Sequence, residues 1–167
     1  MIDDDRPPPT DHRQIHDGEV SAVLDACRIL VAITARSMAA VAEVGDLLEL
    51  RALVVLSGQP PMSLGTLADA VGIHLTRASR LCDRLVARGL IDRTDDPGNR
   101  RQLLLQLTKE GHDVVAKVMQ EREGQIRPIL ARMTPNERKG LVTALGPFAQ
   151  AADGLARTDL WALGWSP

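Results

Sequence analysis

Apolar residues recur at helical spacing over most of this chain. The first such stripe keeps separations of three, four and seven residues, which place its members on one face of a helix. It consists of Val20, Leu24, Cys27, Val31, Met38 and Val41. The pattern predicts a helix from Glu19 to Val44, about 40 Å long, which is more than a domain of this size needs for its own core. A second helix is expected from Asp46 to Leu56.

Two shorter amphipathic helices come next. Ser63 is placed to cap the first, Gly72 to end it, and Gly89 to end the second. Their apolar positions are Leu64, Leu67, Ala68 and Val71 in the first helix, and Ala78, Leu81, Cys82 and Leu85 in the second. Two short helices joined by a glycine-containing turn are typical of a helix-turn-helix, a motif that places its second helix in the major groove of DNA.

A short β-hairpin is predicted after these helices. The run Asp96-Pro97-Gly98-Asn99 supplies turn residues between two strands. Three alternating leucines give the second strand one buried face, namely Leu103, Leu105 and Leu107. The tip carries two adjacent arginines, Arg100 and Arg101. A positively charged hairpin that follows a helix-turn-helix indicates a wing, a two-stranded ribbon whose tip reaches the neighbouring minor groove of DNA. An ordinary polar turn with solvated arginines is the alternative.

Two further helices follow the hairpin. Thr108 is placed to cap a long helix over residues 109–133. The run Thr134–Glu137 (TPNE) is a capping box with proline at the first helical position. The last helix carries apolar residues at heptad-like spacing, namely Leu141, Leu145, Phe148, Ala152 and Leu155.

Positive charge is concentrated in the middle of the chain. The net charge is −2, but residues 76–101 contain seven arginines against four aspartates, an excess of three positive charges. Four of these arginines lie within ~80° of one another on a helix, namely Arg77, Arg80, Arg84 and Arg88. No glutamate stands four residues from any of them and Asp83 points elsewhere, so we expect few acids to pair with this face. A solvated basic face without a partner is the alternative.

Several classes of protein do not fit this sequence. The start is acidic and rich in proline, unlike a signal peptide, and the most apolar stretch, LLELRALVVL, is too short and too charged to span a membrane. We therefore expect a cytoplasmic protein with a disordered acidic tail at residues 1–18. The sequence has no Gly-rich phosphate loop, no catalytic-triad signature and no metal-ligand cluster. Neither an enzyme nor a bound metal or cofactor is expected.

The run LADAVGIHLTRASRLCDRLVARGLIDRTDDPGNRRQLLLQLTKEG resembles the winged-helix core of the MarR (multiple antibiotic resistance regulator) family of bacterial transcription factors. The resemblance is dense from Ser63 to Gly111, where the DRL-x-x-RGL run, the wing and the closing LT-x-x-G keep the family spacing. It extends more weakly over most of residues 19–155. The resemblance implies a homodimer whose terminal helices interlock. It also implies a recognition helix in the major groove of double-stranded DNA and a wing arginine in the minor groove.

The resemblance also assigns roles to individual residues. The groove-facing start of the recognition helix is formed by Thr76, Arg77, Ser79 and Arg80. Arg84 falls near the DNA backbone, and Arg101, beside Arg100, matches the wing arginine. The family usually has an aspartate where this chain has Asn99, so the charge-assisted brace on that arginine is lost. His74 stands where a Ser or Asp cap is common, so Thr76 is expected to cap the recognition helix instead.

The resemblance further implies a sensor function. Family members often bind small, frequently aromatic acids, so a small-molecule effector is implied. One branch senses organic peroxides through a cysteine early in the first helix, where this chain has Cys27. The tyrosines that activate that cysteine are absent here, and we expect Cys27 and Cys82 to be core thiols. A redox-sensing regulator and a winged-helix module for protein–protein contact are the alternatives.

These features predict a mainly α fold with a small β-hairpin wing. A winged helix-turn-helix core (residues 46–108) and long dimerisation helices (19–45 and 109–157) form one domain of residues 19–157, followed by a tail at 158–167. The expected function is that of a sequence-specific, double-stranded DNA-binding transcriptional regulator. We expect a dimeric repressor that recognises an inverted-repeat operator.

Overall fold

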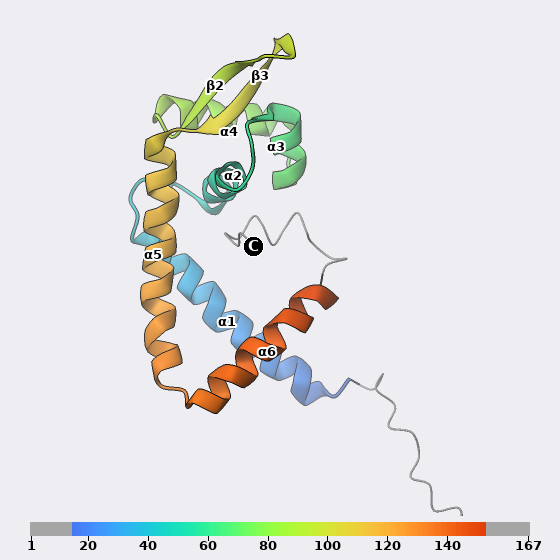
Figure 1. The fold of residues 1–167 in the computed structure, drawn as a ribbon, viewed down its shortest axis with the longest axis vertical. Helices are drawn as coiled ribbons and strands as arrows, with labels where there is room; N and C mark the ends of the chain where they lie inside the picture. Colours follow the sequence, from blue (N-terminus) through green and yellow to red (C-terminus); the bar gives the residue numbers. More distant parts are fainter. Residues whose placement is uncertain (1–14, 153–167) are drawn as a thin grey trace, which may run out of the picture.

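The computed structural model describes residues 15–152 (Figure 1). Short helices and a small sheet lie at one end, and the long helix α5 connects this end to α1 and α6 at the other. The elements follow in the order α1 (Asp17–Ala39), α2 (Leu47–Ser57), β1 (Met62–Ser63), α3 (Leu64–Val71), α4 (Leu75–Ala87), β2 (Ile91–Asp96), β3 (Asn99–Leu107), α5 (Lys109–Ala131) and α6 (Pro135–Ala151). The predicted fold class, mainly α with a small β-hairpin wing, is confirmed.

Helix α2 lies at the centre of the core. Six of its apolar residues are at most 4% exposed, namely Leu50, Ala52, Leu53, Val54, Val55 and Leu56. A helix that is apolar on nearly all sides has to be surrounded, and α3, α5 and β3 pack around it. The predicted stripes of α3 and α4 face the same core, because Leu67, Val71, Leu81 and Leu85 are all buried in it.

Helix α1 differs from the prediction at both ends. It begins at Asp17, so residues 17 and 18 are helical and do not belong to the tail predicted at 1–18. The backbone N–H of His16 donates to the Glu19 carboxylate at 2.8 Å and caps this start. The helix ends at Ala39 and not at Val44. Residues 40–46 form a linker, and its last residue, Asp46, caps α2 by accepting from the N–H of Glu49 at 2.8 Å.

The sheet has three antiparallel strands in the order β1-β3-β2. The predicted hairpin is confirmed as β2 and β3, whereas the two-residue strand β1 was not predicted, because it is too short to show an alternating pattern. Leu105 and Leu107 are buried as expected, but Leu103 is 49% exposed, so its predicted burial is wrong. β1 pairs only with Leu104 and Leu105, and beyond this point the hairpin projects away from the helices (Figure 1).

Local capping signals fix the starts of the last two helices. Thr108 caps α5 as predicted, since its Oγ1 accepts from the N–H of Gly111 at 3.0 Å. The same hydroxyl donates to the carbonyl of Gly89 at 2.6 Å, the residue that ends α4 with a φ of 69°. A Cβ on Gly111 would stand 2.1 Å from the carbonyl oxygen of Leu90, so only glycine fits this contact. The end of α4 is therefore locked to the start of α5.

The predicted capping box of α6 is confirmed. The N–H of Thr134 donates to the Glu137 carboxylate at 2.7 Å, and the N–H of Glu137 donates to the Thr134 hydroxyl at 3.4 Å. The predicted apolar position Leu155 and the predicted tail at 158–167 lie outside the described residues. Among the described helices, none is both long enough and apolar enough to cross a membrane.

Candidate nucleic-acid interface

Helices α3 and α4 form the predicted helix-turn-helix. Ser63 caps α3, accepting from the N–H of Thr66 at 3.1 Å, and Gly72 ends it with a φ of 72°, a conformation that favours glycine. Helix α4 begins at Leu75 with His74 at its N-cap, where no side chain caps the helix. Thr76 therefore lies inside the first turn, and the prediction that it caps the helix is wrong.

The first two turns of α4 present polar and basic side chains to solvent. Thr76, Arg77 and Arg80 are exposed, and Ser79 is half-buried. In the part of the chain that the structure describes, no hydrogen bond or ion pair involves the side chain of Arg77 or Arg80. Their guanidinium groups are thus available to an anionic partner. The buried side of the same helix is formed by Ala78, Leu81, Cys82 and Leu85.

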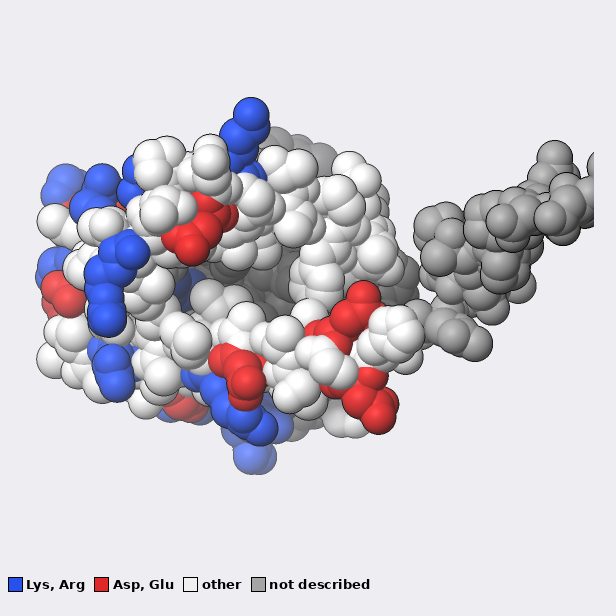
Figure 2. All heavy atoms as spheres, turned by 90° about the horizontal axis from the view of Figure 1, so that it is seen from below, with Lys and Arg blue, Asp and Glu red and all other residues white. Residues whose placement is uncertain are grey.

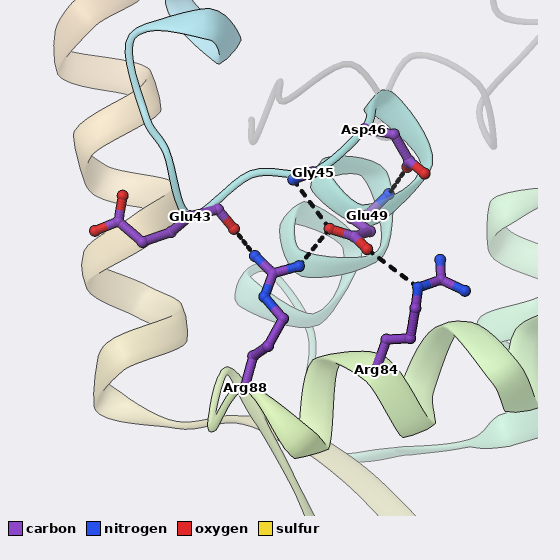
Figure 3. A network of polar contacts seen from close by, with 6 residues as sticks. All are labelled: Glu43, Gly45, Asp46, Glu49, Arg84 and Arg88. Atoms are coloured by element: carbon purple, nitrogen blue, oxygen red, sulfur yellow. Dashed lines mark hydrogen bonds and ion pairs between the residues drawn. The ribbon is translucent and has the colours of Figure 1, made fainter.

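The last two turns of α4 are different, because Arg84 and Arg88 both contact Glu49 of α2 (Figure 3). The Nε of Arg84 lies 3.3 Å from Oε1 of Glu49, and Nη1 of Arg88 lies 2.7 Å from Oε2. Arg88 also donates to the backbone carbonyl of Glu43. The expectation that the arginine face has few acids to pair with is therefore wrong for these two residues. Their partner comes from a different helix, 35 and 39 positions away.

Glu49 is a charged residue in the core, with 4% of its surface exposed. Burial opposes its ionisation, but hydrogen bonds from Arg88 and from the N–H of Gly45, together with Arg84, outweigh that effect. The pKa of Glu49 therefore lies below its usual value. The carboxylate remains charged and holds the second half of α4 against the start of α2.

A further ion pair joins α4 to the wing. Nη2 of Arg93, on β2, lies 2.5 Å from Oδ1 of Asp83, on α4. The Asp83 side chain is more than half exposed, so this contact contributes little to stability by itself. It connects α4 to the base of the hairpin.

The wing turn has the backbone that its sequence predicts. The N–H of Gly98 donates to Oδ1 of Asp96 at 2.8 Å, an Asx-type turn between the strands. Asn99 opens β3 and is exposed. Arg100 and Arg101 follow it on the strand, and their side chains lie outside the described part of the structure. Their predicted DNA contacts remain predictions.

The two cysteines occupy different environments. Cys82 is fully buried, and burial raises the pKa of its thiol to about 11, so it is a core thiol as predicted. Cys27 is exposed in the single chain, which contradicts its predicted burial. Among the described residues, nothing buries the first half of α1, because the two buried residues of this helix, Ile33 and Ser37, both lie in its second half. In the described residues, no group of three His, Cys, Asp or Glu side chains is placed to hold a metal ion.

The helices remote from the helix-turn-helix keep many large apolar side chains exposed. On α1 these are Val20, Val23, Leu24, Ile29, Leu30 and Val31, and on α6 they are Leu141, Val142, Leu145 and Phe148. No residue of α6 is buried. Seen from this end of the molecule, residues other than Lys, Arg, Asp and Glu make up much of the described surface (Figure 2). Exposed apolar faces of this extent are typical of surfaces that contact another protein, a membrane or a ligand.

An open pocket of about 550 Å³ lies between α1 and α5. Apolar residues form most of its lining, including Ile29, Ile33 and Ile129, and Arg36 adds one cation. Such a lining suits an apolar molecule with one negative group.

Comparison with protein-family models gives a match to the MarR family over residues 44–102. The match spans α2 to the start of β3, which is the helix-turn-helix with its wing. The chain is 32% identical over 92 residues to the transcriptional repressor MprA of Escherichia coli K12, a stretch that covers 54% of this chain and 52% of MprA. The chain therefore spans about half the length of this curated relative.

Solved structures resemble the chain over more of its length. The crystal structure of RV1404 from Mycobacterium tuberculosis has 43% sequence identity and a TM-score of 0.78, and the match covers 86% of this chain and 98% of RV1404. The transcriptional regulator Tm0710 from Thermotoga maritima has 22% identity and a TM-score of 0.67, with 81% and 95% covered. At that identity the second likeness shows the fold alone.

Proposed function

This chain belongs to the MarR family, and from that membership we propose that it is a sequence-specific transcriptional regulator that binds double-stranded DNA. It acts as a homodimer and has no catalytic role. Repression is the favoured direction of regulation, because the relative MprA is a transcriptional repressor.

The exposed start of α4 is the observation that carries this proposal. Arg77 and Arg80 stand on the outer face of the second helix of a helix-turn-helix, and no acid in the described chain neutralises them. Arginines in this position suit bidentate hydrogen bonds to guanine in the major groove. The hairpin beside α4 supports a second contact, in which Arg101 enters the minor groove.

The apolar faces of α1 and α6 support the dimer. Within residues 15–152, one chain leaves these faces uncovered, and a second copy with the same faces covers them through a two-fold axis. Such a dimer presents two copies of α4 to one DNA duplex. Its operator is therefore an inverted repeat.

Protein–protein contact through the winged helix is the alternative function. The dependence of binding on salt concentration distinguishes DNA binding from protein–protein contact. For each DNA phosphate that a protein neutralises, the slope of log affinity against log salt concentration becomes more negative by about 0.9. Duplexes selected from a random oligonucleotide pool by the purified protein provide the probe. We expect one enriched sequence, bound more tightly than a scrambled duplex of the same length, with affinity that falls steeply as salt rises.

A matched pair of variants assigns this binding to α4. Arg77→Ala should weaken binding to the selected duplex, whereas Arg127→Ala should not, since Arg127 lies on α5, away from α4, and its ion pair is with the exposed Glu123 of the same helix. If the pool yields no enriched sequence, or if affinity is independent of salt, the chain is not a DNA-binding regulator.

The proposed effector is a small apolar acid, and the pocket between α1 and α5 supports it. Arg36 supplies the cation and the isoleucines supply the apolar walls. Benzoate serves as the probe, since it has one carboxylate and one ring. It should raise the melting temperature of the wild type more than that of Arg36→Met and should release the wild type from the selected duplex. If benzoate changes the melting temperature and the DNA binding of both proteins equally, the effector does not bind in the pocket beside Arg36.

A further inference from the structure

The carboxylate of Glu49 makes contacts with three other groups. Oε2 accepts from the N–H of Gly45 at 3.0 Å and from Nη1 of Arg88 at 2.7 Å, while Oε1 faces Nε of Arg84 at 3.3 Å. A Cβ at position 45 would stand 2.6 Å from Oε2, so the glycine provides the space that the carboxylate fills. With both oxygens engaged and the side chain buried, the carboxylate is held in one orientation.

This orientation determines how Arg84 is presented to solvent. The contact with Glu49 uses only Nε of Arg84. The two terminal nitrogens point away from Glu49 (Figure 3), and the Arg84 side chain is 52% exposed. A guanidinium fixed at Nε keeps its terminal N–H groups in a fork that matches a phosphate.

We propose that Glu49 is a positioning residue for DNA binding, which orders the Arg84 guanidinium so that its terminal nitrogens meet a backbone phosphate. This inference rests on the proposed function and adds to it a buried residue that does not touch DNA. Without Glu49 the exposed arginine has to be ordered when DNA binds, at an entropic cost.

Arg88 supports the same arrangement from the next turn of α4. It contacts Glu49 and the backbone carbonyl of Glu43, and the Glu43 carboxylate in turn accepts from Lys117 of α5 at 2.6 Å. These contacts connect α5, the linker before α2 and the recognition helix. The carboxylate that orients Arg84 is thus fixed with respect to the helix that joins both ends of the molecule.

The direction in which Glu49→Gln changes the affinity for DNA tests the inference. Glu49→Gln keeps the size of the side chain and removes its charge. Electrostatics alone predicts tighter DNA binding after an acid is removed, and this is expected for the control Asp69→Asn, which removes an exposed acid beside Arg77. The inference predicts the opposite for Glu49→Gln. Its affinity for the selected and the scrambled duplex should fall roughly three- to tenfold, and the salt slope should shrink by about 0.9 for each recognition helix.

A double-mutant cycle identifies Arg84 as the residue through which Glu49 acts. Arg84→Ala should weaken binding in the wild type and have little further effect in Glu49→Gln, so the two changes should not add. Thermal unfolding checks that Glu49→Gln is folded. If it is not, Arg88→Gln removes, from the solvent side, one of the contacts that hold the Glu49 carboxylate in place. With the carboxylate less well oriented, Arg84→Ala should again have a smaller effect than in the wild type.

The outcomes separate this inference from the proposed function. Tighter binding by Glu49→Gln, as in the Asp69→Asn control, would overturn the inference and leave the function intact. Additive effects in the cycle would do the same. If the wild type selects no duplex, the proposed function and this inference fall together.

Discussion

Arg77 and Arg80 differ from Arg84 in what their guanidinium groups already contact. The first two have no partner in the described chain, whereas Arg84 is held by Glu49. We expect Arg77→Ala or Arg80→Ala to cost about 1–3 kcal/mol on the preferred duplex and to relax its sequence preference, because a base contact is lost. Arg84→Ala should weaken all sequences alike, because a phosphate contact is lost. Fluorescence anisotropy on selected and scrambled duplexes measures both effects. Equal losses on both duplexes for all three variants would mean that no base is read by these residues.

Cys27 is exposed in the single chain, but it lies on the apolar stripe of α1 that the proposed dimer covers. The described chain places no metal cluster near it, and the sequence has no tyrosine to activate it. We expect peroxide to affect DNA binding by the wild type and by Cys27→Ser alike. A gel-shift titration with peroxide measures this. Release of the wild type alone at low peroxide would make the protein a redox sensor.

At the scale of single residues, the sequence predicts those parts of the candidate site that depend only on the spacing of residues along one helix. The outward positions of Arg77 and Arg80 follow from 3.6 residues per turn. The pairing of Arg84 and Arg88 does not, since Glu49 lies on another helix. One signal was present: Glu49 interrupts the apolar run LLELRALVVL, and a buried carboxylate requires cationic partners. The sequence does not show which arginines those partners are.

At the scale of elements, helix starts were predictable because the capping residues are local. Ser63, Thr108 and Thr134 each cap the helix that they were expected to cap. The end of α1 was not predictable, because it depends on how Asp46 and Gly45 arrange the start of α2. The strand β1 was missed for a similar reason, since its two residues are ordered only by pairing with β3.

The wing provides a test at this scale. Asn99 stands two residues before Arg101, where an aspartate would brace that arginine by a charge-assisted hydrogen bond. Asn99→Asp should therefore pre-order Arg101 and sharpen the preference for A·T-rich over G·C-rich flanks, although it adds negative charge near the phosphates. Binding to duplexes that differ only in their flanks measures the preference. If Arg101→Ala leaves the preference unchanged, the wing does not read the flanks.

At the scale of the whole molecule, the apolar faces of α1 and α6 make the single chain incomplete. Deleting residues 134–167 removes α6, and with it the exposed leucines and Phe148 that a second copy would cover. We expect this truncated chain to be insoluble or monomeric and to lose operator binding. Analytical ultracentrifugation reports the oligomeric state. A folded full-length monomer that binds the selected duplex would contradict the dimer.

The geometry of the operator follows from that dimer. Two α4 helices related by a two-fold axis read half-sites of opposite orientation, so the target should be an imperfect inverted repeat. On a straight duplex the half-site centres should lie one helical turn apart, roughly 10–10.5 bp. The wings, which carry Arg100 and Arg101, then fall on the two outer flanks.

Footprinting on the selected duplex should show two protected half-sites with this spacing. Inserting half a turn between them, about 5 bp, should abolish tight binding, because the second α4 then faces the wrong side of the duplex. Full-affinity binding to a single half-site would show that the two recognition helices do not act together.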